Sequence, residues 1–279
     1  MTRLLLRCVL AALLIATTAR ASAAGFTGPA QPLAIGDTLM LKSDVLAETR
    51  RINVYMPPHV GPGPAPALPV LVMPDGGLAE DFLHVAGLLQ VGVGNGTVRP
   101  FLLVGIENTE RRRDLTGPTT QDSDKKIAPR VGGSAAFRAF IREELLPALA
   151  ERYRVTDERA LMGESLAGLF VVETWALEPS LFSTYIAFDP SLWWNAAGLQ
   201  PATQAALRER KGAAPRLYIA ASSEPGILKA SQPFAEMLKR ELAPGSAFQY
   251  VALPQETHAT IYHPAALQAL RQLFKPAAP

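Results

Sequence analysis

Cysteine is almost absent from this chain of 279 residues, whose single example is Cys8. Cys8 lies in an amino-terminal segment that we expect to be removed, so the mature chain would contain no cysteine. A disulfide, a thiol nucleophile and a cysteine-bound metal are therefore excluded for the mature chain. Any chemistry must come from other side chains.

An excess of one charge is also missing, because 27 basic residues nearly balance 25 acidic ones and no block of the chain is strongly basic. Nucleic-acid-binding proteins usually carry a basic patch or stripe, so we expect no nucleic-acid partner. The 48% hydrophobic and 19% charged residues are typical of folded proteins and argue against disorder.

A hydrophobic run long enough to span a membrane is missing too. The first 26 residues contain Arg3 and Arg7, an apolar core over residues 8–16 and small residues ending at Ala21-Ser22-Ala23. A spanning helix needs roughly 20 apolar residues, so this layout favours a cleaved secretory signal over a membrane anchor. We expect a signal peptide at residues 1–23 and a single domain at residues 24–279. The mature protein would then lie in a bacterial periplasm or outside the cell, without membrane contact.

Short apolar runs alternate with helical patterns along the rest of the chain. Strands are expected at residues 69–73, 101–106, 185–188 and 216–222, in RALMG and in FQYVALP, and helices at 135–153, 232–242, 264–274 and directly after Ser165. DTLMLKS and RRINVYMPP alternate as an antiparallel hairpin does. The pattern predicts an α/β fold with a mostly parallel central sheet and helices on both faces.

The segment ALMGESLAGLF, residues 160–170, places Ser165 between a strand and a helix. A serine on such a sharp turn is exposed as a nucleophile, and the turn needs small flanking residues, here Gly163 and Ala167. The alternative is an ordinary serine that caps a helix. Because an acid and a histidine follow downstream at other strand ends, where sites form in parallel sheets, we interpret Ser165 as a nucleophile.

Such a serine requires a base, an acid to orient the base, and donors for the oxyanion. His258 follows the last expected strand and is the expected base, with His263 in reserve. Glu224, just beyond the preceding strand, is the first choice for the acid. Asp189 is the alternative, and a Ser–His pair without an acid is also open.

The backbone N–H of Leu166, next to the nucleophile, is expected to donate to the oxyanion. The second donor is expected in the loop after residues 69–73, from Gly77 or Leu78, because Gly76 and Gly77 allow close approach of the backbone. The alternative for Asp-Gly-Gly is a plain turn.

Two further segments suggest a binding pocket. The arginines of NTERRRDLTGP, residues 108–118, could receive an anionic or polyoxygenated group, although surface arginines are often only solvated. Trp193 and Trp194 in PSLWWN could form an aromatic wall, although core packing is an equal alternative for at least one of them.

The chain also resembles a known family through RINVYMPP, LPVLVMPDGG, VGIENTERRRDLTGP, FRAFIREELLPALAERY, GESLAGLF, FDPSLWWN and ETHATIYHPA, which run in the family's order. The family is the putative esterase branch of the α/β-hydrolases, and ENTERRRDLT and PSLWW are most similar to siderophore-esterase-like hydrolases. The resemblance implies an α/β-hydrolase fold and a serine hydrolase for carboxylic esters that uses no metal or other cofactor. It carries over Ser165 as nucleophile, His258 as base and Arg113 as a substrate contact.

The chain departs from the family pattern at three positions. Glu164 and Ala167 stand where His and Gly are common, and Asp189 stands where a small polar residue is expected. The last departure keeps Asp189 open as the acid.

We therefore expect an exported serine hydrolase that cleaves a small-molecule carboxylic ester, such as a siderophore or aromatic ester, through an acyl-enzyme on Ser165. The alternatives are an acyltransferase of the same fold and a non-catalytic protein that binds siderophores or aromatic esters. The sequence names neither the substrate nor an oligomeric state.

Overall fold

Apolar strands of this chain assemble into one sheet in the computed structural model, which describes residues 28–59 and 62–276. Residues 34 onward form one compact unit, and residues 28–33 are exposed and have no helix or strand. The signal peptide expected at residues 1–23 lies outside the described residues.

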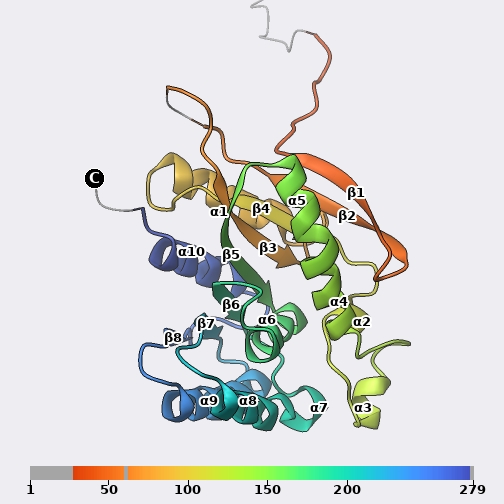
Figure 1. Cartoon of the computed structure of the whole chain (residues 1–279), viewed down its shortest axis with the longest axis vertical. Helices are drawn as coiled ribbons and strands as arrows, with labels where there is room; N and C mark the ends of the chain where they lie inside the picture. The colour runs from red at the N-terminus through yellow and green to blue at the C-terminus, as the bar shows by residue number, and fades with distance from the viewer. Residues whose placement is uncertain (1–27, 60–61, 277–279) are drawn as a thin grey trace, which may run out of the picture. The chain divides into compact units, whose positions relative to one another are not determined.

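The sheet has eight strands in the order β1-β2-β4-β3-β5-β6-β7-β8 (Figure 1). The strands are β1 (Asp37–Ser43), β2 (Glu48–Tyr55), β3 (Leu68–Pro74), β4 (Leu102–Ile106), β5 (Val155–Glu164), β6 (Thr184–Phe188), β7 (Arg216–Ala221) and β8 (Phe248–Ala252). β1 and β2 pair antiparallel, β2 also pairs antiparallel with β4, and all pairs from β4 to β8 are parallel.

The connections between the strands are mostly helical. The helices are α1 (Phe82–Gly94), α2 (Arg111–Asp114), α3 (Asp122–Lys125), α4 (Ser134–Phe140), the π-helical turn η1 (Ile141–Leu145), α5 (Leu146–Arg152), α6 (Leu166–Leu177), α7 (Trp194–Ala197), α8 (Leu199–Glu209), α9 (Pro225–Glu241) and α10 (Tyr262–Leu273). α4, η1 and α5 follow one another directly and occupy the segment expected as one helix at 135–153.

Each face of the sheet carries its own core because successive side chains of a strand point to opposite faces. In β3, Val70 and Val72 belong to the core that includes side chains of α4, α5, α6 and α9. Leu71 and Met73 belong to the core that includes side chains of α1 and α10. Figure 1 shows α1 and α10 away from α4 and α5. This arrangement confirms the expected mostly parallel sheet with helices on both faces.

The order of the strands determines where the loops meet. β3 lies between β4 and β5. The chain passes from β3 to β4 on one side and then crosses to β5 on the other side, so the strand order reverses at β3. Ligands of open α/β sheets bind at such a switch point, beyond the carboxyl ends of the strands. The loops after β3, β4, β5 and β6 therefore meet at one edge, and these loops carry most of the residues singled out in the sequence. Among the described residues, no helix combines the length and apolar character needed to cross a bilayer.

Candidate active site

Ser165 occupies a sharp turn between β5 and α6. Its backbone angles, φ 59° and ψ −117°, are strained for a residue with a side chain. Gly163 makes this turn possible, because a Cβ atom there would lie 2.6 Å from the Cβ of Ala167 and 2.8 Å from its carbonyl carbon. The local geometry is therefore the strand–turn–helix that presents a serine, and Ser165 is not an ordinary helix cap: its side chain makes no capping hydrogen bond.

A chain of hydrogen bonds joins Ser165, His258 and Asp189. Oγ of Ser165 lies 3.2 Å from Nε2 of His258, and Nδ1 of His258 lies 3.0 Å from Oδ2 of Asp189. A carboxylate only accepts hydrogen bonds, so Nδ1 carries the proton. Nε2 is then the acceptor for the hydroxyl of Ser165, as a general base for serine must be.

Asp189 is fully buried, and Ser222 binds both of its carboxylate oxygens. Its Oδ1 accepts the backbone N–H of Ser222 at 2.6 Å, and its Oδ2 accepts the Ser222 hydroxyl at 2.6 Å. Ser222 follows β7, the strand next to β6, so the order of the sheet brings it to Asp189. We did not predict Ser222 as a site residue from the sequence, although its position at the end of an expected strand could have indicated it.

The carboxylate that contacts His258 is Asp189, which corrects the first choice of Glu224. β6 pairs directly with β5, so the residue after β6 lies next to the serine turn. Glu224 lies beyond β7, one strand farther away, where it is exposed and precedes the first turn of α9. No hydrogen bond or ion pair joins Glu224 to His258 in the described part of the chain.

Two carboxylates face the same imidazole nitrogen. Oε1 of Glu164 lies 3.9 Å from Nδ1 of His258, beyond hydrogen-bond distance but close enough for a strong charge interaction. The hydrogen bond to Asp189 is the main cause that raises the pKa of His258 above its ordinary value of 6.5. Burial raises the pKa of Glu164 to about 7, against the opposing effect of His258.

The loop after β3 packs against β4 at Gly76, whose Cα has no room for a side chain. A Cβ atom there would lie 2.2 Å from Cα of Gly105 in the neighbouring strand. The N–H of Gly77, the expected second oxyanion donor, donates to Oε2 of Glu80 at 2.7 Å. The expected first donor, Leu166, begins α6, where backbone N–H groups have no acceptor within the helix.

Arg111 binds the loop after β3 through Asp75. Its guanidinium binds both oxygens of Asp75, at 2.7 and 2.8 Å, and Asp75 also accepts a hydrogen bond from Asn108. Glu164, which directly precedes Ser165, is among the charges that raise the pKa of Arg111. The sequence named the arginine segment but not this residue.

Arg113, the expected substrate contact, is occupied elsewhere. Its guanidinium pairs with Glu48, Glu110 and Asp114, and its side chain is 16% exposed. A guanidinium that three carboxylates already neutralise has little left to offer a substrate, so the structure does not favour Arg113 in this role.

The two tryptophans behave differently. Trp194 is buried, and its indole N–H donates to the carbonyl oxygen of Gly117 at 2.9 Å. Trp193 is 42% exposed and its ring centre lies 6.2 Å from that of Trp194. Ser191, in the same loop, lies 3.4 Å from Ser165, oxygen to oxygen. Trp193 is therefore the tryptophan available to a ligand, and Trp194 supports it from the core.

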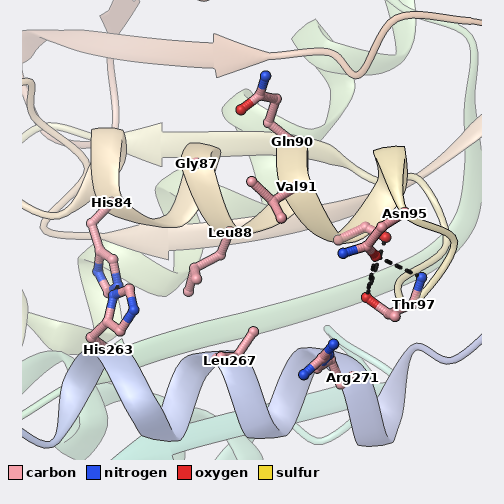
Figure 2. Close-up of a pocket in the computed structure, with 11 residues that line it drawn as sticks. His84, Gly87, Leu88, Gln90, Val91, Asn95, Thr97, His263, Leu267 and Arg271 are labelled. Carbon is pink, nitrogen blue, oxygen red and sulfur yellow. Dashed lines mark hydrogen bonds between the residues drawn. The ribbon is translucent and has the colours of Figure 1, made fainter.

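His263, the reserve base, pairs with a different residue. Its Nδ1 lies 2.8 Å from Nε2 of His84, and the two rings stack at one end of a groove between α1 and α10 (Figure 2). The groove has a volume of about 520 Å³, and Arg271 lies at its other end. Ser165 does not line this groove, and its Oγ contacts His258 and not His263. Within residues 28–59 and 62–276, no cluster of three or more His, Cys, Asp or Glu side chains is suited to hold a metal ion.

Comparisons with known proteins show which family and fold this chain resembles. The family model described as "Putative esterase" matches residues 43–259. The ferri-bacillibactin esterase BesA of Bacillus subtilis is 30% identical over 168 residues, which cover 53% of this chain and 56% of that protein. The apo-salmochelin esterase of Escherichia coli O6:H1 is 29% identical over 163 residues, 53% of this chain and 49% of that protein. The chain thus matches about half the length of these curated relatives.

A solved structure covers more of the chain. An IroE-like serine hydrolase from Shewanella oneidensis superposes with a TM-score of 0.78 and 27% identity, over 86% of this chain and 80% of that one. The enterobactin esterase FES from Shigella flexneri has the same fold, with a TM-score of 0.69, 21% identity and coverage of 89% of this chain and 61% of that one. These similarities confirm the α/β-hydrolase fold and the likeness to siderophore-esterase-like hydrolases. Because the family model spans most of the chain, from the last residue of β1 to the residue after His258, the chain belongs to the putative esterase family.

Proposed function

We propose that this protein hydrolyses carboxylic esters through an acyl-enzyme on Ser165. The observation that carries the proposal is the hydrogen-bonded chain from Ser165 through His258 to the buried Asp189, on a strained turn of an esterase-family fold. Serine, histidine and a buried carboxylate in this order of contacts recur in hydrolases of unrelated folds.

The first step forms the acyl-enzyme. Nε2 of His258 takes the proton of the Ser165 hydroxyl while Oγ bonds to the carbonyl carbon of the ester, and the carbonyl oxygen becomes an oxyanion. The imidazolium then gives this proton to the departing alkoxide, and the acyl group stays on Oγ. Asp189 stabilises the imidazolium through Nδ1 and keeps the ring in the tautomer that this step needs.

The second step releases the acid. His258 takes a proton from a water molecule, whose oxygen attacks the acyl carbon, and returns the proton to Oγ of Ser165 as the carboxylic acid leaves. The N–H of Leu166 supports the oxyanion in both steps. For Gly77 to act as a second donor, the carboxylate of Glu80 must first turn away from its N–H.

The substrate class follows from the relatives. BesA is named for a ferri-bacillibactin ester and the matched Escherichia coli protein for apo-salmochelin, so we propose siderophore esters and related aromatic esters as substrates of this chain. The signal-like residues 1–23 support a periplasmic or secreted location, where such molecules pass.

A hydrolysis assay tests the proposal. The purified protein and its Ser165→Ala variant are compared on p-nitrophenyl acetate and butyrate, and then on a panel of siderophore and feruloyl esters. We expect activity that the variant loses, since the hydroxyl is the attacking group. Equal activity of the two proteins would reject Ser165 as the nucleophile. Product analysis with an added alcohol separates hydrolysis from acyl transfer.

A further inference from the structure

The imidazole of His258 has a second carboxylate beside it that the proposed mechanism does not use. Glu164 is the last residue of β5 and directly precedes Ser165. Its Oε1 lies 3.9 Å from Nδ1 of His258, the same nitrogen that donates to Asp189. Asp189 is sealed from solvent, whereas the Glu164 side chain is 20% exposed. One imidazole nitrogen therefore faces a fully buried acid and a partly exposed one.

We propose that Glu164 is a second acid for His258: it stabilises the imidazolium together with Asp189 and partly replaces Asp189 when that carboxylate is removed. The inference rests on the ester hydrolysis proposed above and deepens it. Glu164 touches no reacting atom, so it acts as a positioning residue through His258. Glu164 directly precedes Ser165, so the turn that brings Ser165 to His258 also brings Glu164 close to the ring.

Geometry limits what Glu164 can do in the intact site. At 3.9 Å it makes no hydrogen bond to Nδ1, since N–H···O bonds are shorter than about 3.2 Å. Asp189 holds the only carboxylate oxygen at hydrogen-bond distance from this nitrogen within the described chain. Glu164 therefore contributes charge while Asp189 is present. A loss of the Asp189 charge leaves Glu164 as the acid next to the ring, 3.9 Å from Nδ1.

The surroundings of Glu164 shift its ionisation toward neutral pH. Three carboxylates on other elements raise the pKa of Glu164 further, and the charge of Glu164 in turn raises the pKa of one arginine. These groups are Asp75 after β3, Asp81 before α1, Asp189 after β6 and Arg111 in α2. Burial, with help from the carboxylates, raises the pKa of Glu164 to about 7. Above that pH the second acid is charged and favours the imidazolium, and below it this support is lost.

A double-mutant cycle tests the proposal, because such a cycle isolates the interaction between two groups. The four proteins are the wild type, Glu164→Gln, Asp189→Asn and the double variant, assayed on p-nitrophenyl butyrate. We expect Glu164→Gln to lower kcat about 2–5-fold in the wild type but at least about 10-fold in the Asp189→Asn background. We also expect the acid-side midpoint of the kcat/KM profile to fall by about half a pH unit in Glu164→Gln, because a nearby negative charge is lost.

Glu224→Gln is the matched control. Glu224 is also a glutamate beyond a strand end, and its charge also acts on His258, but it makes no contact with the ring. We expect its substitution to change kcat by the same small factor, less than about 2-fold, in both backgrounds. Equal factors for Glu164→Gln in the two backgrounds, with an unmoved pH midpoint, would overturn the proposal. So would coupling of Glu224→Gln to Asp189 as strong as that of Glu164→Gln.

A measurement without turnover separates this inference from the proposed function. The pKa of His258 is followed by NMR in Ser165→Ala protein, with and without Glu164→Gln. We expect Glu164→Gln to lower the pKa of His258, and an unchanged pKa would overturn the inference. If the wild type hydrolyses no ester, the proposed function fails, while the titration still decides whether Glu164 acts on His258. Glu164→Asp keeps the negative charge on a shorter side chain, so we expect it to lower the pKa of His258 less than Glu164→Gln does. A purely structural role of Glu164 would not produce this partial recovery.

Discussion

Asp189 and His258 are 69 residues apart in the chain, yet Oδ2 of one lies 3.0 Å from Nδ1 of the other. This contact decides which acid supports the candidate base. It arises because β6, which ends just before Asp189, pairs directly with β5, the strand that leads into Ser165. The carboxylate of Asp189 is fully buried, Ser222 holds it in position, and it binds the imidazole of His258.

Removal of this carboxylate should damage catalysis far more than removal of Glu224. We expect Asp189→Asn to lower kcat about 10²–10³-fold, because an amide neither stabilises the imidazolium nor selects its tautomer. Glu224→Gln should stay within about 2-fold of the wild type, since it only removes an exposed charge. Steady-state kinetics on p-nitrophenyl butyrate measure both. A larger loss in Glu224→Gln would return Glu224 to the role of the acid.

Ser222 should matter for both stability and activity. Its buried hydroxyl donates to Oδ2 of Asp189, and Ser222→Ala removes that bond while the backbone N–H bond remains. We expect a loss of about 1–2 kcal/mol in the free energy of unfolding and a drop of about 10-fold in kcat, because Asp189 is less firmly held. Ser223→Ala is the control, since that hydroxyl is exposed and bonds to the backbone of Glu256. Equal effects of the two substitutions would contradict the role given to Ser222.

The rate of hydrolysis should fall in acid. His258 acts as a base only when it is neutral, so kcat/KM rises with pH as the ring loses its proton. The hydrogen bond to Asp189 raises the pKa of His258 above 6.5, and the acid-side midpoint should therefore lie above that pH. A profile measured from about pH 5 to pH 9 gives the midpoint. A midpoint near the pKa of an ordinary carboxyl would point to a different base.

Glu164 should also make the folded protein less stable as the pH rises. Burial raises its pKa from 4.5 to about 7, so between these values the folded state keeps a proton that the unfolded state has lost. Stability then falls as pH increases through this window. Glu164→Gln cannot ionise, so we expect it to be more stable than the wild type at pH 8 and similar to it near pH 4. Thermal unfolding at the two pH values measures this, and an equal difference at both would contradict it.

Much of the sheet could be predicted because buried parallel strands are short apolar runs bounded by turns. The strand at 69–73 and the helix at 135–153 match β3 and α4–α5 within one residue at each end. α1 was not predicted: its 13 residues carry no charge, and glycines interrupt the pattern. We expected α9 to begin at residue 232. This helix instead begins at Pro225, and Pro233 lies inside it.

The site was predictable in part for a similar reason. Chain order placed Ser165 and His258, because the serine turn and the last strand have local signals. Chain order could not choose between Asp189 and Glu224, since the choice depends on which strands are neighbours. Nor could it separate Arg111 from Arg113, which lie two residues apart in α2 and whose partners come from distant parts of the chain, Asp75 for one and Glu48 for the other.

The most direct test of the central claim is covalent labelling of the nucleophile. The purified protein is treated with a fluorophosphonate, and the modified peptide is identified by mass spectrometry, with Ser165→Ala as the control. We expect one label per chain on Ser165, loss of hydrolysis in step with labelling, and no label in the variant. A label on another residue, or none on a protein that hydrolyses esters, would contradict the assignment of Ser165 as the nucleophile.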